Sequence, residues 1–311
     1  MKTFTLPGTD IVAPNVVLGL MRIQDKSDDE VRELVRTARD AGITFVDHAA
    51  VYGDEKHGCE ARFAEALDLT PSQRDEYVIQ TKVGIIKDGP YFDFSYEEIV
   101  SSVEGSLQAL RTDHVDILLL HRPDALVEPD EVARAFDELA AAGKVRAFGV
   151  SNHTPRQIDL LKKSVTQPLV VNQVQLSITH APLVAAGVSA NMAGLDQSID
   201  RDGGLLDYCR LHDITLQAWS PFQKGFFDGV FLGDREQYAE LNDVVDRLAA
   251  RYGVTPIGIA TAWITRHPAQ MQVVLGTTTP SRVTEAAAGS QIPLTRAEWY
   301  ELFRAAGHRV P

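Results

Sequence analysis

The chain has 311 residues, and 44% of them are hydrophobic, so it is long enough to bury a sizeable core. Its 30 Lys and Arg residues against 43 Asp and Glu residues give a formal net charge of −13. A surface that binds nucleic acid needs clustered basic residues. The sequence has no basic run, so we expect no nucleic-acid partner.

No apolar stretch approaches the roughly 20 residues that span a bilayer, so we expect no membrane association. The N-terminal segment lacks the apolar core of a secretory signal. Cys59 and Cys209 lie far apart and in no metal-ligand spacing, which favours a reducing compartment over a disulfide framework. These features predict a cytoplasmic protein in which Cys59 packs in the core.

Strand-like and helix-like patterns alternate from the start of the chain. The strands predicted in the first half span residues 16–20, 43–46, 77–81 and 115–120. A helix begins at the capping box of Ser27 and Glu30 and ends before Gly42. Further helices are predicted over residues 55–67 and from Ser95 onward.

The alternation continues through the second half of the chain. The strands predicted there span residues 145–150, 169–171, 214–218 and 273–275. The predicted helices span residues 129–142, 237–252 and 256–267, and others begin at Thr154, Pro280 and Thr295. Residues 177–204 are rich in Gly, Ala, Ser and Asp, so we expect a long irregular connection.

Eight strands, most of them followed by a helix, predict parallel pairing, and eight such units predict closure. We therefore expect an α/β protein, a (β/α)8 TIM barrel with extra helices near the C-terminus. An open doubly wound sheet is the alternative, but it binds dinucleotides through a G-x-G-x-x-G turn, which this sequence lacks. No linker divides the chain, so residues 1–311 are predicted to form a single domain.

Polar and aromatic residues stand where the predicted strands end. They are Asp47, Tyr52, Lys82, His121, Ser151, Asn152, Gln173, Trp219 and Ser220. Each residue alone has an ordinary explanation, such as a solvated lysine or a hydrogen-bonded histidine. In a parallel barrel all strands open at the same end, so one site there accounts for all of them together.

These residue types suit carbonyl reduction. A tyrosine hydroxyl has a pKa near about 10, and we expect an ammonium group at Lys82, held by Asp47, to lower the pKa of Tyr52 towards neutrality. His121 could orient the oxygen of a carbonyl group while Tyr52 donates a proton. No amino acid donates hydride, so a cofactor is required.

Parts of a nicotinamide site are also present. Ser151, Asn152 and Gln173 are suited to hydrogen-bonding a carboxamide, and Trp219 offers a flat face for stacking. The Gly- and Thr-rich turn at 276–282 enters a helix, where free N–H groups and Arg282 suit a phosphate.

With these residues in place, the chain resembles the aldo/keto reductase superfamily, in its bacterial branch with short C-terminal tails. The motifs that carry the likeness, in chain order, are VDHAAVYG, IQTKVG, DILLLHRPD, VRAFGVSN, VNQVQLS, AWSP and LGTTTPSR. The likeness covers nearly the whole length and implies a barrel that binds NAD(P)H without a Rossmann fold. The short tail implies an open pocket.

The resemblance also implies roles for individual residues. Asp47, Tyr52, Lys82 and His121 match a catalytic tetrad in which Tyr52 is the general acid. The residues matched to cofactor binding are Ser151, Asn152, Gln173, Trp219, Ser220, Pro221, Gly276, Thr277, Thr278, Arg282, Glu285, Met21 and Arg22. Within this set, Arg282 matches a contact to the adenosine 2′-phosphate and Glu285 a residue near the adenine. Met21 and Arg22 are also expected to shape the pocket, together with Ile85, Ile86 and residues 177–204.

The implied activity is reduction of a small-molecule aldehyde or ketone to the alcohol by NADPH. NADH stays open as an alternative, because the turn before Arg282 lacks the lysine found in many relatives. A regulatory or assembly protein that binds the cofactor on the same barrel also stays open. The sequence specifies neither the physiological substrate nor the oligomeric state.

Two further enzyme classes fit the sequence less well. A metal site formed by Asp47, His48 and His121 is disfavoured, because neighbouring residues on a strand point to opposite sides. A Schiff-base aldolase that used Lys82 would leave Tyr52, Trp219 and the phosphate turn without a role.

Overall fold

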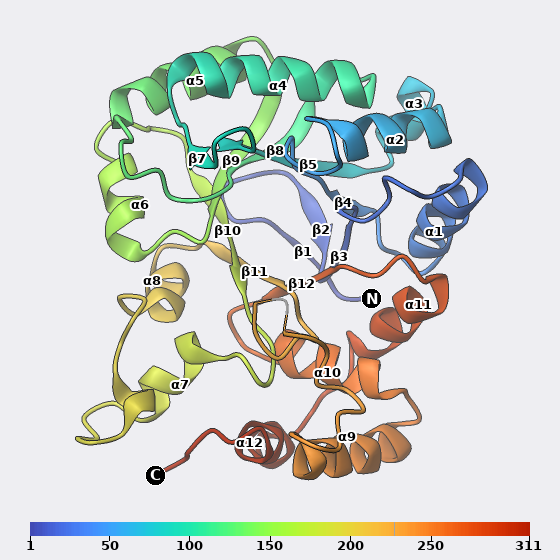
Figure 1. Cartoon of the computed structure of the whole chain (residues 1–311), viewed down its shortest axis with the longest axis vertical. Coiled ribbons are helices and arrows are strands. Elements are labelled where there is room, and N and C mark those ends of the chain that lie inside the picture. Colours follow the sequence, from blue (N-terminus) through green and yellow to red (C-terminus); the bar gives the residue numbers. More distant parts are fainter. Residues whose placement is uncertain (227) are drawn as a thin grey trace.

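Eight parallel strands close into a barrel in the computed structural model, which describes residues 1–226 and 228–311 (Figure 1). The barrel strands are β3 (Val16–Gly19), β4 (Phe45–Asp47), β5 (Val78–Val83), β8 (Val115–Leu120), β9 (Val145–Ser151), β10 (Leu169–Gln175), β11 (Thr215–Trp219) and β12 (Gln272–Leu275). Consecutive strands pair in chain order, and β12 pairs with β3 to complete the ring. The predicted TIM barrel is confirmed.

Helices surround the barrel, as Figure 1 shows. They are α1 (Asp28–Asp40), α2 (Gly58–Leu67), α3 (Pro71–Arg74), α4 (Tyr96–Leu110), α5 (Pro129–Ala141), α6 (Pro155–Leu161), α7 (Pro182–Val188), the 3-10 turn η1 (Asp196–Ser198), α8 (Leu205–Leu211), α9 (Ala239–Tyr252), α10 (Pro256–Thr265), α11 (Pro280–Gly289) and α12 (Arg296–Ala305). Helices α9 and α12 pack against each other beside α10, so extra helices lie near the C-terminus as predicted. Within the described residues, none of the helices is long and apolar enough to cross a membrane.

Capping boxes start two of the helices whose beginnings were predicted from the sequence. Ser27 accepts a hydrogen bond from the N–H of Glu30, whose carboxylate accepts from the N–H of Ser27, and α1 begins there. Thr295 and Glu298 repeat the pattern at α12. The prediction for α2 was wrong at its start: the helix begins at Gly58 rather than residue 55, because His57 has a left-handed backbone with φ of 68°.

The connection at residues 177–204 is more ordered than predicted. It contains α7 and η1, and the C-terminal segment holds it in place. The His308 ring hydrogen-bonds the carbonyl of Ile178 at 2.8 Å. The N–H of Arg309 donates to the side chain of Gln197 at 2.9 Å. Sequence periodicity did not reveal α7, because this short helix has few large apolar residues to mark a buried face.

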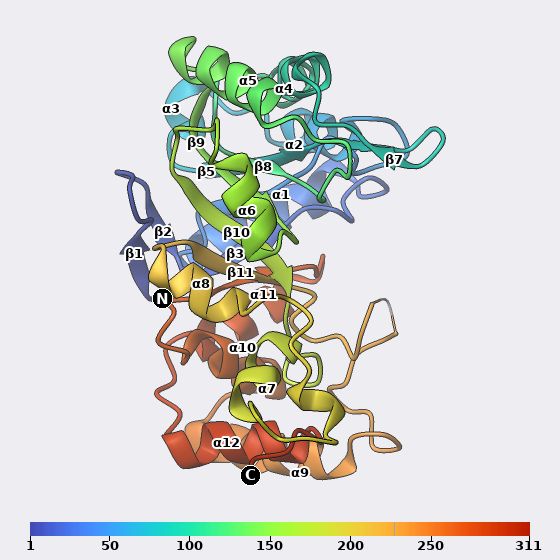
Figure 2. The same cartoon turned by 90° about the vertical axis from the view of Figure 1, so that its left-hand side faces the viewer.

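Two hairpins lie at opposite ends of the barrel (Figure 2). The first pairs β1 (Thr3–Thr5) with β2 (Val12–Pro14), and its Leu6 and Ile11 join the apolar cluster inside the barrel. This hairpin forms a floor. The second pairs β6 (Ile85–Ile86) with β7 (Tyr91–Phe92) directly after β5, at the end where the strands open.

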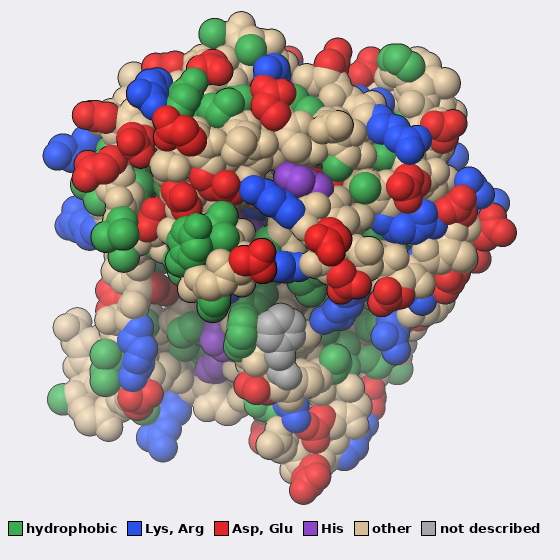
Figure 3. All heavy atoms as spheres, turned by 45° about the horizontal axis from the view of Figure 1, so that its top comes forward, with side chains coloured by type: hydrophobic (Ala, Val, Ile, Leu, Met, Phe, Trp, Pro, Cys, Tyr) green, Lys and Arg blue, Asp and Glu red, His purple; other side chains and the backbone are tan. Residues whose placement is uncertain are grey.

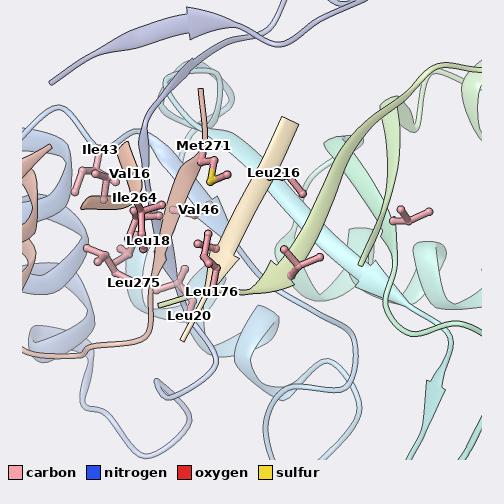
Figure 4. Close-up of a cluster of buried hydrophobic side chains, with 14 of the residues drawn as sticks. Val16, Leu18, Leu20, Ile43, Val46, Leu176, Leu216, Ile264, Met271 and Leu275 are labelled. Carbon is pink, nitrogen blue, oxygen red and sulfur yellow. The ribbon is translucent and has the colours of Figure 1, made fainter. Parts of the chain in front are cut away.

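The surface and the interior differ in the expected way. Acidic and basic side chains are interspersed over the face of the molecule in Figure 3. Val16, Leu18 and Val46 lie in the large buried cluster between strands and helices, part of which is drawn in Figure 4. Val17 and Phe45, of opposite parity, belong instead to the cluster inside the barrel.

This alternation positions the polar strand ends. Side chains on a strand alternate between its two faces, so Asp47 points the same way as Phe45, into the barrel. By the same count, His121 follows Ile117 and Leu119, two other residues of the interior cluster. The alternation of side chains along each strand therefore places these polar side chains together inside the barrel, at its open end.

Candidate active site

Three of the predicted residues form a hydrogen-bonded chain at the open end of the barrel. The ammonium of Lys82 donates to Asp47 Oδ2 at 2.7 Å, to the carbonyl of His48 at 2.8 Å and to the hydroxyl of Tyr52 at 3.2 Å. Lys82 is fully buried, so its charge depends on these partners. The loop after β4 thus returns Tyr52 to the lysine that β5 presents.

His121 completes the group. Its ring meets the ring of Tyr52 edge-on, with centroids 5.7 Å apart and planes at 81°. Burial, assisted by the positive charges of Lys82 and Arg122, holds the pKa of His121 well below its ordinary value. The imidazole is therefore neutral at physiological pH and carries one N–H that can donate to an oxygen.

The pKa of Tyr52 moves in the direction opposite to our expectation. Burial raises the pKa of the phenol. Lys82 lowers it, as predicted, but by less, so the pKa ends above its ordinary value. For Lys82 the balance favours charge: burial lowers the pKa of the ammonium, but Asp47 and Tyr52 raise it above its ordinary value. At neutral pH, Tyr52 therefore keeps its proton and Lys82 is charged.

A chain of buried glutamines links Asp47 to the floor of the barrel. Gln80 and Gln173 each donate to Asp47 Oδ1, at 2.5 and 3.1 Å, and both donate to Gln217 Oε1 at 2.9 Å. Gln217 in turn donates to Gln272 Oε1 at 2.9 Å, and Gln272 donates to the carbonyl of Pro14 at 2.6 Å. Asp47 is thus held from below by amides as well as from the side by Lys82.

A cavity of about 850 Å³ opens beside this group. The predicted residues that line it are Met21, Arg22, Asp47, Tyr52, Ile85, His121, Ser151, Asn152, Gln173, Trp219, Ser220, Pro221, Gly276, Thr277, Thr278 and Arg282. Lys82 lies beneath the lining and reaches the cavity through Tyr52.

Some predicted pocket residues lie elsewhere. In the described part of the chain, neither Ile86 nor any residue of 177–204 lines the cavity, so these two predictions were wrong. Residues 177–204 pack on the C-terminal segment instead. Glu285 is also absent from the lining and accepts a hydrogen bond from Thr255 at 3.0 Å, so its assignment to the adenine stays a prediction.

The predicted carboxamide residues come together with Trp219. The indole N–H of Trp219 donates to Asn152 Oδ1 at 3.0 Å, and the Asn152 amide donates to Ser151 Oγ at 2.8 Å. Ser151 donates to the carbonyl of Gln173 at 2.8 Å. Asn152 and Ser220 both have left-handed backbones, with φ of 61° and 51°, directly after β9 and β11, the two strands that flank β10. Such backbone conformations concentrate at functional sites.

The far end of the cavity suits a phosphate. Arg22 donates to the carbonyl of Gly276 at 3.0 Å, and the N–H of Thr279 donates to Thr277 Oγ1 at 3.1 Å, which shapes the turn before α11. The side chain of Arg282 has no hydrogen-bond or ion-pair partner among the described residues. A free guanidinium on the first turn of a helix can bind a phosphate.

Neither His48 nor Cys59 belongs to the site. His48 packs against Phe63 of α2, with ring centroids 5.0 Å apart, on the opposite face of β4 from Asp47. Among residues 1–226 and 228–311, no group of three or more His, Cys, Asp or Glu side chains is placed to hold a metal ion. Cys59 is fully buried, as predicted.

Sequence reasoning missed several polar residues of the site, one of them Gln223 of the cavity lining, and four others matter to the geometry described above. These four are Gln80, Arg122, Gln217 and Gln272. For the glutamines on strands, the alternation of side chains along a strand was a usable signal. Each of these glutamines lies an even number of residues from a predicted site residue or an interior apolar residue on the same strand, so it points into the barrel. Arg122 directly follows His121, but sequence alone does not show that it lines the cavity.

Comparison with known proteins identifies the class. A model of the Aldo/keto reductase family matches residues 15–305. YdhF, an oxidoreductase of Escherichia coli, is 34% identical over 95% of this chain and 94% of its own. The chain therefore belongs to the aldo/keto reductase family, a family of oxidoreductases.

Further relatives agree in fold and length. The 6-dehydroglucose reductase of Agrobacterium fabrum is 33% identical over 93% of this chain and 92% of its own. The crystal structure of a glycerol dehydrogenase from Gluconobacter oxydans superposes with a TM-score of 0.78 at 25% identity, covering 98% of this chain and 95% of that chain.

Proposed function

We propose that this protein is an NADPH-dependent reductase that converts an aldehyde or ketone to the alcohol. The observation that carries the proposal is the chain of Asp47, Lys82 and Tyr52, which ends on a phenol at the cavity wall beside a neutral His121. The Agrobacterium relative, a 6-dehydroglucose reductase, belongs to the same reaction class.

In this proposal Tyr52 is the general acid. Its raised pKa keeps the phenol protonated, and the ammonium of Lys82 stabilises the phenolate that remains after the proton has moved to the carbonyl oxygen. The neutral imidazole of His121 donates a hydrogen bond to the same oxygen and orients it. Asp47 keeps Lys82 charged and aimed at Tyr52.

The bound cofactor would supply the hydride, and the residues present fit it. Trp219 offers an aromatic face, and Ser151, Asn152 and Gln173 offer polar groups for a carboxamide at the catalytic end. At the other end the turn at Gly276 to Thr278 and the unpaired Arg282 suit the phosphates. Arg282 favours NADPH, whose extra phosphate gives a guanidinium a partner. NADH is the alternative to be compared.

The test uses purified protein, NADPH and 4-nitrobenzaldehyde, with oxidation of NADPH followed by absorbance. Wild type is expected to turn over, and Tyr52→Phe is expected to lose at least about 100-fold in kcat, the usual size of a general-acid contribution. Titration of tryptophan fluorescence should show that Tyr52→Phe still binds NADPH.

The matched control is Tyr96→Phe, because Tyr96 lies on α4 and hydrogen-bonds Glu138 outside the cavity. It should leave turnover within about twofold of wild type, as surface substitutions usually do. Tight NADPH binding with no turnover across a panel of aldehydes and ketones would contradict the proposal and favour a regulatory protein.

A further inference from the structure

Arg122 is a cation in the cavity without a counter-ion among the described residues. Its side chain is half-buried, lines the cavity and lies over the ring of Trp219, with Cζ 5.6 Å from the ring centroid. No hydrogen bond or ion pair to another described residue involves its guanidinium. Burial of a guanidinium without an anionic partner is unfavourable, so the residue calls for an explanation beyond packing.

The carboxylate in the cavity lining, Asp47, and the carboxylate two residues along the chain, Asp124, already have other donors. Asp124 accepts hydrogen bonds from the backbone N–H groups of Phe94 and Leu126, at 3.0 and 2.8 Å. Asp47 accepts from Lys82 and from two glutamines. Neither Asp47 nor Asp124 is therefore an ion-pair partner of Arg122 displaced by a small side-chain movement, since both carboxylates have other donors.

The cavity is positive although the protein is acidic. Its lining contains three guanidinium groups, Arg22, Arg122 and Arg282, and one carboxylate, Asp47, which Lys82 neutralises. A concave site lined by one sign of charge concentrates ligands of the other sign. Substrates that carry a negative charge would thus be drawn to this mouth in preference to neutral ones.

The three cations divide between the two ends of the cavity. Arg22 and Arg282 lie with the turn at Gly276, where we place the phosphates of the cofactor. Arg122 lies at the other end, close enough to His121 and Tyr52 for their charges to influence one another. The cofactor phosphates therefore lie at the opposite end and do not pair with Arg122. The molecule beside Arg122 is the substrate that receives the proton from Tyr52.

We propose that Arg122 binds a carboxylate of the carbonyl substrate, so that the preferred substrates are oxo acids, aldehydes or ketones that also carry a carboxylate. The inference rests on the proposed reductase function and assigns its substrate class. A guanidinium offers two parallel donors that match the two oxygens of a carboxylate. Trp219 lies on one side of the guanidinium, which also lines the cavity.

The kinetic test compares matched substrates. Benzaldehyde is paired with 4-carboxybenzaldehyde, and butanal with succinic semialdehyde, each reduced with NADPH by wild type, Arg122→Gln and Arg122→Lys. We expect wild type to favour the acid of each pair by at least about tenfold in kcat/KM, because hydrogen bonds to charged groups contribute about 10- to 100-fold. Arg122→Gln should abolish this preference, mainly through KM, and Arg122→Lys should retain part of it.

Arg134→Gln is the control. Arg134 also lies over an aromatic ring, that of Tyr96 at 3.8 Å, but outside the cavity, so its replacement should not change the preference for acids. An equal loss for both members of a pair in Arg122→Gln would overturn the proposal and leave the guanidinium as a packing group. A wild type with no preference for acids would overturn it as well.

A binding measurement separates this proposal from the reductase function. Calorimetry with the NADPH-loaded protein and benzoate, which has no carbonyl group to reduce, should show saturable binding to wild type that Arg122→Gln weakens by about tenfold or more. If benzoate binds in this way while no aldehyde is reduced, the reductase function fails and the anion site stands. If aldehydes are reduced but benzoate binding is absent or unchanged in the variant, the reductase stands and the anion site fails.

Discussion

At the scale of single residues, the candidate site balances burial against charge. Burial raises the pKa of Tyr52 more than Lys82 lowers it, whereas for Lys82 itself the partners outweigh burial. A phenol that stays protonated beside a charged ammonium is suited to giving up its proton only when a carbonyl oxygen gains negative charge. Under the proposed function, this arrangement favours reduction at neutral pH.

Replacement of Lys82 tests this balance. In Lys82→Met the pKa of Tyr52 should rise further, because burial remains and the lowering charge is gone. We expect kcat for reduction to fall by about 100-fold or more. Reduction needs protonated Tyr52, so the alkaline fall in rate should move to higher pH than in wild type, where burial already raises the pKa of Tyr52. Rates measured from pH 6 to the alkaline limit of stability check this.

Two controls guard this measurement. Lys82→Met leaves Asp47 buried without its ion pair, so the double variant with Asp47→Asn, which removes both charges, should recover stability without recovering rate. Lys144→Met, at an exposed ion pair with Glu104, should change neither rate nor pH profile. An unchanged alkaline limb in Lys82→Met would argue that Tyr52 does not set it.

The sequence predicted the positions of these residues better than it predicted their pKa values. The positions of Asp47, Tyr52, Lys82 and His121 at strand ends were enough to predict that they meet. The predicted direction of the shift in the Tyr52 pKa was wrong. That direction depends on how deeply the phenol is buried, which a local sequence pattern does not reveal. Arg122 was missed for the same reason.

At the scale of elements, the barrel interior is polar where the strands carry glutamine. Gln80 on β5, Gln173 on β10, Gln217 on β11 and Gln272 on β12 satisfy one another across the interior. Buried amides are stabilising when every member is paired and costly when one partner is removed. The strands are therefore tied together by their side chains as well as by backbone pairing.

Gln217→Leu should show how much this network contributes. The substitution leaves Gln80 Oε1 and Gln272 Oε1 without their donor, and each unsatisfied buried group costs about 1–3 kcal/mol. We expect the free energy of unfolding in urea to fall by roughly 2–6 kcal/mol on this basis. If the loss of unfolding free energy were no larger than in the control variant described next, the stabilising role of the network would be contradicted.

Gln175→Leu is that control. Gln175 lies on β10 two residues beyond Gln173, and its amide nitrogen is buried without a partner among the described residues. Removing it leaves no other group unpaired, so its stability should stay within about 0.5 kcal/mol of wild type or rise.

Element boundaries followed from local chemistry where that chemistry was strong. The capping boxes at Ser27 and Thr295 start α1 and α12 as predicted. Strand β10 continues to Gln175, beyond the predicted end at residue 171, and its Gln173 is paired inside the barrel rather than exposed. Polarity was misread as the end of the strand, since a single sequence does not show a partner on another strand.

At the scale of the whole molecule, buried histidines make the fold sensitive to acid. Burial lowers the pKa of His48, His153 and His267 from 6.5 to about 4. Between these pH values the unfolded chain binds more protons than the folded one, so stability falls as pH drops from 6.5 towards 4. One such group contributes roughly 2 kcal/mol of this loss at pH 5, as an order of magnitude.

His48→Leu should remove one such contribution. Neither ring nitrogen of His48 has a partner among the described residues, so protonation in the fold has nothing to stabilise it. The difference in free energy of unfolding between pH 7 and pH 5 should shrink by about 1–2 kcal/mol. Packing changes affect both pH values alike and cancel. Exposed His212→Leu is the control, and an equal shrinkage there would contradict the assignment to His48.

The floor formed by β1 and β2 shares none of its residues with the cavity lining in the described chain. The mouth draws on loops that follow the barrel strands, whose sequences can change without altering the strand pairing. Directed evolution of a new specificity could therefore randomise the rim at Met21, Ile85 and Phe222 while the hairpin preserves foldability. Sequence changes that alter specificity and residues that maintain the fold thus lie at opposite ends of the barrel.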